Sequence, residues 1–199
     1  MPIHKVITRI VLAYGLITCL GLAGQAQQLE VGLKAGINIC SQRFAGNGLP
    51  SGIQSLTGFH VGIYSIIPYS AHISFQPEVL LSTCGVKLDY SGTGYEDTFT
   101  YVSVPLLVRY KISERIQLHG GPQVGILCSA KETSGGSSFD TRNDFKNGDF
   151  SLVLGAGIDL PLKFNLAARY SFGISDVDKI GDESTKNSAF QLSVGYRVF

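Results

Sequence analysis

In eight segments after residue 28, large apolar residues occupy every second position, and most of the residues between them are polar or glycine. At the start of this part, Leu29, Val31 and Leu33 alternate with Glu30 and Gly32. Side chains of a β-strand point alternately to its two faces, so this period predicts strands with one apolar and one polar face. No segment in this part shows a convincing period of 3.6 residues, the pattern of an amphipathic helix. We therefore expect an all-β chain.

Eight segments carry the alternation, and long and short connections alternate between them. The expected strands cover residues 29–38, 58–64, 73–81, 102–111, 116–126, 150–159, 164–173 and 190–199. The long connections are 40–56, 84–99, 130–149 and 176–187, and the short ones lie near 67–71, 113–115 and 161–163. Outer-membrane barrels show this arrangement, with short periplasmic turns and long outer loops. We expect an eight-stranded antiparallel up-and-down transmembrane β-barrel with both termini in the periplasm.

The charges on the polar face decide between a membrane barrel and a soluble one. A soluble barrel keeps its apolar side chains inside, and a soluble sandwich can show the same alternation. Here many polar positions are glycine, which suits a narrow interior, and charges of both signs share that face. We expect a lumen charge network of Glu30, Lys34, Glu78, Arg109, Arg169 and Arg197. Because they lie on neighbouring strands, Glu78 is expected to pair with Arg109, and Arg197 with Glu30.

Aromatic residues on the apolar face fall into two groups at the ends of the expected strands. Near the short turns they are Phe75, Tyr110, Phe164 and Tyr196, and near the long loops they are Phe59, Phe150, Phe172 and Phe190. Transmembrane barrels carry girdles of aromatic side chains at both membrane interfaces. The two groups predict such girdles, and together with the loop pattern they favour the membrane barrel over a sandwich.

The first residues resemble a secretory signal peptide. The segment 1–9 carries Lys5 and Arg9 and no acid, and an uncharged apolar stretch follows it. Cleavage after Ala26 would leave Gly24 and Ala26 at the two positions where small residues are required. The apolar stretch is short for a membrane anchor helix, and Thr18 before Cys19 fits a lipoprotein signal poorly. We expect a signal peptide at 1–26 and one β-barrel domain at 27–199.

The net charge of the chain bears on the classes of partner that it could bind. The chain carries 16 Lys and Arg against 15 Asp and Glu, and loss of Lys5 and Arg9 leaves 14 against 15, a net charge of −1. Such a balance gives no electrostatic basis for binding nucleic acid.

Cys40, Cys84 and Cys128 remain after cleavage, an odd number in a compartment that permits disulfides. The default expectation is free or loosely paired thiols.

Motifs that would carry chemistry are weak. The segment GAGID, Gly155–Asp159, lacks the third glycine and the following helix of a dinucleotide loop. A calcium loop that began in the acidic segment Asp176–Glu183 would need an oxygen ligand at its fifth position and glutamate at its twelfth, but Ile180 and Asn187 stand there, so a solvated loop is expected. His60 and His119 lie on the polar face of non-adjacent strands, where hydrogen-bonded lumen residues are expected rather than catalysts. We expect no catalytic residue, no cofactor and no metal site.

Five segments, taken in their order and spacing, resemble the PorT-like outer-membrane β-barrel family of Gram-negative bacteria. They are FQPEVLLSTCGVKL (Phe75–Leu88), YVSVPLLVRYKI (Tyr101–Ile112), LHGGPQVGIL (Leu118–Leu127), LVLGAGIDL (Leu152–Leu160) and LAARYSFGISDV (Leu166–Val177). The resemblance covers essentially the whole chain after the signal. It implies an eight-stranded barrel in the outer membrane. The namesake of the family takes part in type IX protein secretion, whereas most members have no assigned role.

These patterns favour a non-enzymatic outer-membrane barrel with a filled polar lumen and a structural or loop-mediated interaction role. One alternative is an accessory component of type IX secretion or envelope assembly. Another is a small outer-membrane enzyme that modifies lipids or peptides. A diffusive porin is disfavoured because side chains fill the lumen of eight strands. The expected partners are outer-membrane lipid, the barrel-assembly machinery during insertion, and envelope or secretion proteins.

Overall fold

The computed structural model of the chain describes residues 29–44, 53–90, 93–134, 137–140, 148–175 and 185–199. In these ranges the chain forms nine strands, and no helix is long and apolar enough to cross a membrane. The strands are β1 (Glu30–Phe44), β2 (Ile53–Pro68), β3 (Ile73–Tyr90), β4 (Thr93–Lys111), β5 (Ile116–Ser134), β6 (Ser137–Asp140), β7 (Gly148–Asp159), β8 (Phe164–Gly173) and β9 (Thr185–Arg197). The expected signal peptide and the acidic segment 176–183 lie outside the described residues.

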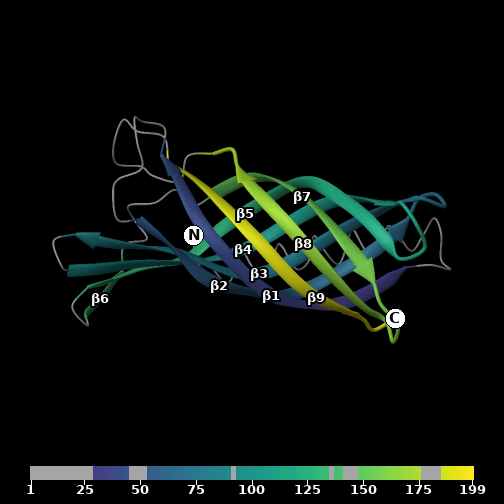
Figure 1. The fold of residues 1–199 in the computed structure, drawn as a ribbon, viewed down its shortest axis with the longest axis horizontal. Helices are drawn as coiled ribbons and strands as arrows, with labels where there is room; N and C mark the ends of the chain where they lie inside the picture. The colour runs from purple at the N-terminus through teal and green to yellow at the C-terminus, as the bar shows by residue number, and fades with distance from the viewer. Residues whose placement is uncertain (1–28, 45–52, 91–92, 135–136, 141–147, 176–184) are drawn as a thin grey trace.

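Eight of these strands close into one antiparallel barrel (Figure 1). The ring runs β1, β2, β3, β4, β5, β7, β8, β9 and returns to β1, while β6 pairs with β5 alone among the described strands. The last strand closes the ring along a long register, from Gly32 opposite Arg197 to Phe44 opposite Thr185. A closed ring leaves no unpaired sheet edge, which hydrocarbon would not tolerate. The eight-stranded antiparallel barrel that the alternation predicts is confirmed.

Burial along the strands is the reverse of that in a soluble barrel. On β1, the side chains of Leu33 and Ile37 are 55% and 46% exposed, whereas Lys34 and Asn38 are 2% and 1% exposed. The same alternation follows β8, where Leu166 is exposed and its neighbours on either side are buried. Large apolar groups face outward and polar groups face inward, the arrangement that lipid demands of a barrel.

Three tight hairpins join strands at one end of the barrel, which we call the turn end. They lie at Tyr69–His72, Ile112–Arg115 and Leu160–Lys163, as the short connections predict. In the third hairpin, Leu162 and Lys163 have φ angles of 62° and 66°. The start of β1 and the end of β9 also lie at the turn end, because Glu30 pairs with Ile66 before the first hairpin and Tyr196 pairs with Phe164 after the third. We call the opposite end the loop end.

At the loop end the strands continue far into two segments that the sequence predicts to be loops. β3 runs to Tyr90 and β4 begins at Thr93, so most of 84–99 is a paired hairpin. β5 runs to Ser134 and pairs with β6, which lies inside the expected loop 130–149. The prediction of long irregular loops is wrong there, because these stretches satisfy their backbone groups by pairing with each other. Figure 1 shows this part projecting beyond the barrel on the left.

Candidate functional site

The middle of the lumen is occupied by a cluster of buried charges around Glu78, which we call the central cluster. Glu78 is completely buried and accepts hydrogen bonds from Lys34 Nζ at 2.5 Å and from Gln76 Nε2 at 2.6 Å. Arg169 binds both carboxylate oxygens of Glu78 through Nη1 and Nη2, each at 2.8 Å. Its Nε donates to Nε2 of His119 at 2.7 Å. Such a saturated bidentate pair offsets the cost of removing these charges from water.

The topology explains why these side chains meet. Lys34, Glu78, His119 and Arg169 lie on β1, β3, β5 and β8, which are alternate strands around the ring of eight. Inward side chains from alternate strands therefore form one layer across the lumen. Gly155 makes room for this layer, because a Cβ there would lie 2.7 Å from both Arg169 Cγ and His119 Nε2. The central cluster thus fills the lumen from wall to wall at this level.

A second group of charges, the turn-end cluster, lies between the central cluster and the turn end of the barrel. Arg197 Nη1 binds Glu30 Oε2 at 3.0 Å, and Arg197 Nη2 lies 3.9 Å from Asp159 Oδ1. Arg109 is almost fully buried and donates a hydrogen bond to the Asp159 carboxylate. The predicted pair of Arg197 and Glu30 is confirmed. Four charges, two of each sign, neutralise one another at the turn end.

The predicted pair of Glu78 and Arg109 is wrong, and the strand register gives the reason. Although β3 and β4 are neighbours, Arg109 lies opposite Ser74, four residues before Glu78. Four residues of strand separate the two by about 13 Å along the sheet. Arg109 reaches Asp159 instead. Asp159 stands on the polar face at the end of β7, and β4 and β7 both pair with β5, so the two inward side chains meet across one intervening strand.

Toward the loop end, neutral polar side chains take over from charges. Asn38 Oδ1 lies 2.7 Å from His60 Nδ1, and Asn38 Nδ2 donates to Ser82 Oγ at 2.9 Å. Gln191 Nε2 donates to Asn38 Oδ1 at 3.2 Å. The prediction that His60 is a hydrogen-bonded lumen residue is confirmed, and the same holds for His119 in the central cluster.

A disulfide links the walls of the lumen at the loop end. Cys40 on β1 and Cys84 on β3 are bonded, with their Cα atoms 5.7 Å apart. Cys128 is free. The default expectation of free or loosely paired thiols is therefore wrong for Cys40 and Cys84. The two strands are separated by β2 in the sheet, so only the curvature of the closed barrel brings the two side chains together inside it.

The eight aromatic residues predicted as girdles all lie on the outer surface. Their side chains are between 37% and 55% exposed: Phe59, Phe75, Tyr110, Phe150, Phe164, Phe172, Phe190 and Tyr196. At the turn end the rings of Phe164 and Tyr196 pack with their centroids 5.0 Å apart. Their position at two membrane interfaces stays a prediction.

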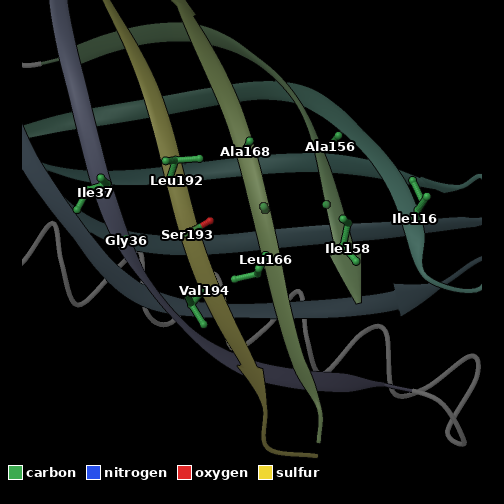
Figure 2. Close-up of a pocket in the computed structure, with 12 residues that line it drawn as sticks. Gly36, Ile37, Ile116, Ala156, Ile158, Leu166, Ala168, Leu192, Ser193 and Val194 are labelled. Carbon is green, nitrogen blue, oxygen red and sulfur yellow. The ribbon is translucent and has the colours of Figure 1, made fainter. Parts of the chain in front are cut away.

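The outer wall also carries a shallow apolar groove of about 690 Å³ over β1, β5, β7, β8 and β9 (Figure 2). Small side chains, Ala156 and Ala168, lie along it. The larger apolar side chains around them are Ile37, Ile116, Ile158, Leu166, Leu192 and Val194. These six side chains are among the exposed large hydrophobic groups of the barrel. The groove is therefore part of the outward apolar surface and separate from the lumen.

No described part of the chain brings together three or more His, Cys, Asp or Glu side chains that could hold a metal ion.

No curated protein matches the sequence. The fold is similar to that of Ail, the attachment invasion locus protein of Yersinia pestis, with a TM-score of 0.51 and 21% identity over 86% of this chain and 99% of that one. It is also similar to Neisserial surface protein A (NspA), with a TM-score of 0.50 and 14% identity over 85% and 96% of the two chains.

The sequence family described as outer membrane protein beta-barrel domain matches residues 25–179, which is more than half of the 199 residues. Strands β1 to β8 fall within this stretch. The closed ring of eight strands, the outward apolar surface and the two outer-membrane neighbours agree with that match. The chain belongs to the family of outer-membrane proteins built on a beta-barrel domain.

Proposed function

We propose that the protein is a non-enzymatic, non-conducting outer-membrane barrel that presents its projecting strands to a partner. The proposal places the three short turns and both termini in the periplasm, and the loop end on the outer side of the membrane. The short turns and the projecting loop-end strands support the assignment, because this asymmetry is typical of bacterial outer-membrane barrels. Acyl chains of outer-membrane lipid would cover the apolar outer wall, after insertion by the barrel-assembly machinery.

The observation that carries the proposal is the central cluster. Its charged groups bind one another across the whole lumen, so an ion would have to break several buried ion pairs to pass. His60 and His119 are 2% and 4% exposed and hydrogen-bond to Asn38 and Arg169, which leaves a substrate no access to them. The interior therefore supports a structural role for its charges rather than transport or catalysis.

The projecting strands support the interaction part of the proposal. Residues 85–90 of β3, 93–99 of β4, 129–134 of β5 and 137–140 of β6 pair into one sheet, the projecting sheet. β6 stands last in its strand order and pairs with β5 alone in the described chain. The outer edge of β6 can therefore accept hydrogen bonds from, and donate them to, an extended peptide added as a further strand.

Electrical recording tests the closed lumen. The purified chain, reconstituted in planar bilayers, is expected to give no single-channel steps at either polarity. A matched variant, Arg169→Ala, removes the side chain that binds both Glu78 and His119, and reports whether the assay detects a lumen that has been opened. Stable unitary conductance of the unmodified protein would contradict the proposal, as would turnover of phospholipid or peptide substrates by the same preparation.

In-cell cross-linking tests the interaction role. A photoreactive residue at Ser138 on β6 is expected to give a defined adduct with a partner protein. The same reactive residue at Glu114, on the opposite end of the barrel, serves as the control position. Identical adducts from both positions, or none from β6, would contradict binding at the projecting sheet.

A second candidate is an accessory role in type IX secretion or envelope assembly. The five segments that resemble the PorT-like family favour it, since the namesake of that family takes part in this secretion route. Deletion of the gene, followed by measurement of exported proteins in the medium, tests this role. Normal export in the deletion strain would exclude it and leave the interaction role.

A further inference from the structure

A small cavity lies in the lumen, on the loop-end side of Asn38, which forms part of its lining. We call it the loop-end cavity. Its volume is about 40 Å³, and its lining includes Tyr101, Gln123 and Asp149. A cavity of this size holds two or three groups the size of a water molecule. The disulfide forms part of its wall, because Cys84 also lines it.

Asp149 brings a carboxylate into this cavity, and no described cation pairs with it. Its Oδ1 accepts a hydrogen bond from Ser175 Oγ at 3.2 Å, and its Oδ2 accepts a long one from Asn187 Nδ2 at 3.4 Å. The other lumen carboxylates, those of Glu30, Glu78 and Asp159, each lie within 4.0 Å of an Arg or Lys nitrogen. No such contact to Asp149 is found in the part of the chain that the structure describes.

The surplus positive charge of the central cluster does not supply the missing cation. Lys34 and Arg169 exceed Glu78 by one charge, but Arg169 lies opposite Gly155, six residues along β7 from Asp149. Six residues of strand span about 20 Å, well beyond the range of a salt bridge. Among the residues that the structure describes, no cation therefore balances the Asp149 carboxylate.

Gln123 adds a second unsatisfied acceptor. Its Nε2 donates to Ser151 Oγ at 3.2 Å, whereas its Oε1 is buried and has no hydrogen-bond partner among the described residues. Buried polar atoms are normally hydrogen-bonded, so an unpaired acceptor beside a carboxylate calls for a donor that carries positive charge. The phenolic oxygen of Tyr101 and the hydroxyl of Ser103 complete a lining rich in acceptors.

We propose that the loop-end cavity binds the primary ammonium group of a ligand, R–NH₃⁺. Such a group has the size of a water molecule, one positive charge and three N–H donors, which match the carboxylate of Asp149 and the neutral oxygens around it. A guanidinium or a quaternary ammonium is too large for the cavity. A metal ion is disfavoured because the described residues hold no cluster of ligating side chains. This site concerns the mouth of the lumen and does not depend on the role of the projecting sheet.

The test uses the full barrel refolded in detergent micelles, with methylammonium chloride as the probe and backbone amide NMR as the readout. Saturable shifts are expected at Gly125, Asp149 and Asn187, which surround the cavity. Tetramethylammonium, which has no N–H donor, and sodium are expected to give only small linear changes. Equal responses to sodium and methylammonium, no saturation, or tighter binding of calcium would overturn the proposal.

Two variants separate binding from folding. Asp149→Asn keeps the shape of the side chain and removes its charge, so the dissociation constant for methylammonium should rise about tenfold or more. Gly125→Ala fills the cavity floor, because its Cβ would lie 3.4 Å from Asp149 Cβ and 3.5 Å from Tyr101 Cδ1, ordinary van der Waals distances. Glu114→Gln, at the turn end, should bind as the unmodified protein does. Unchanged binding by either cavity variant would overturn the proposal, and Gly125→Ala decides it if Asp149→Asn fails to fold.

Discussion

Glu78 shows how a single residue makes a charged interior tolerable. A fully buried carboxylate costs several kcal/mol unless cations and hydrogen-bond donors surround it. Glu78 has two cations, Lys34 and Arg169, and an amide donor from Gln76, so both of its oxygens are occupied. The same contacts hold the two cations in place. Removal of this one charge should therefore affect three buried side chains at once.

Substitution of Glu78 by Gln is expected to destabilise the barrel by about 3–5 kcal/mol, because the buried guanidinium of Arg169 would keep its charge without a counter-ion. Urea unfolding in lipid vesicles, followed by the heat-modifiable shift on gels, measures the change. Glu114→Gln removes a carboxylate from an exposed turn and should leave the midpoint unchanged. Equal midpoints for the two variants would show that the central cluster adds nothing to stability.

The turn at Leu160–Lys163 stores backbone strain at two neighbouring residues. Leu162 and Lys163 adopt positive φ angles, which Asn and Gly tolerate far better than other residues. The double substitution Leu162→Asn and Lys163→Gly should therefore stabilise the hairpin by about 1 kcal/mol or more. The same unfolding assay measures the gain. Glu114→Gly, in a turn without positive φ at a non-glycine residue, should give no gain, and an equal gain there would contradict the explanation.

At the residue scale, the alternation in sequence predicted which side chains enter the lumen but not which of them meet. Lys34, Arg109 and Arg169 are buried as their polar-face positions predict. Their partners depend on the strand register and on the reach of side chains across the ring, which no local pattern contains. Asp159 was not among the six charges expected in the lumen, and the structure makes it the partner of Arg109.

At the scale of the strand, the apolar alternation located all eight barrel strands but underestimated six of them by five or more residues at the loop end. The expected strand 102–111 begins at Thr93, and the expected strand 73–81 continues to Tyr90. Beyond the membrane both faces of a strand meet water, so the alternation weakens while backbone pairing continues. Polar, glycine-rich segments such as these give no strong period from which a strand could be predicted. The turns, in contrast, were predicted because they interrupt strong alternation.

The disulfide ties two strands that are not neighbours, and its removal should loosen the loop end. Cys40 and Cys84 are 44 residues apart in the sequence. A cross-link over such a loop typically stabilises a protein by about 2–4 kcal/mol, chiefly by restricting the unfolded chain. The double variant Cys40→Ser, Cys84→Ser is expected to unfold at a lower urea concentration than the unmodified protein. Cys128→Ser, which removes the free thiol, should have little effect.

Treatment with a reductant supplies the second half of this test. The unmodified protein should lose stability when it is unfolded in reductant, whereas the double variant should not respond. A reductant effect of the same size in both proteins would show that the disulfide is not the source of the stability.

At the scale of the whole molecule, the barrel carries its apolar side chains outside and its polar side chains inside, the reverse of a soluble barrel. Because apolar side chains face outward, the polar groups of eight strands must satisfy one another inside, and a ring of eight strands leaves space for little else. The sequence predicted this inversion from the charges on its polar face, together with the sorting of long and short connections. The disulfide could not be predicted, because it arises from a contact between two segments that are distant in sequence.

The outward apolar surface gives the last prediction, which concerns Leu192. This residue lies opposite Ile37 on β1 and Ala168 on β8, near the middle of the apolar band and beside the groove in Figure 2. An arginine in place of Leu192 would enter hydrocarbon and should destabilise the barrel in lipid vesicles by about 2–4 kcal/mol. An arginine at Leu162, on an exposed turn at the end of the barrel, should cost about 0–1 kcal/mol because such positions reach the interface. Equal costs at the two positions, or a chain that stays folded in buffer without detergent, would mean that water rather than lipid surrounds the wall.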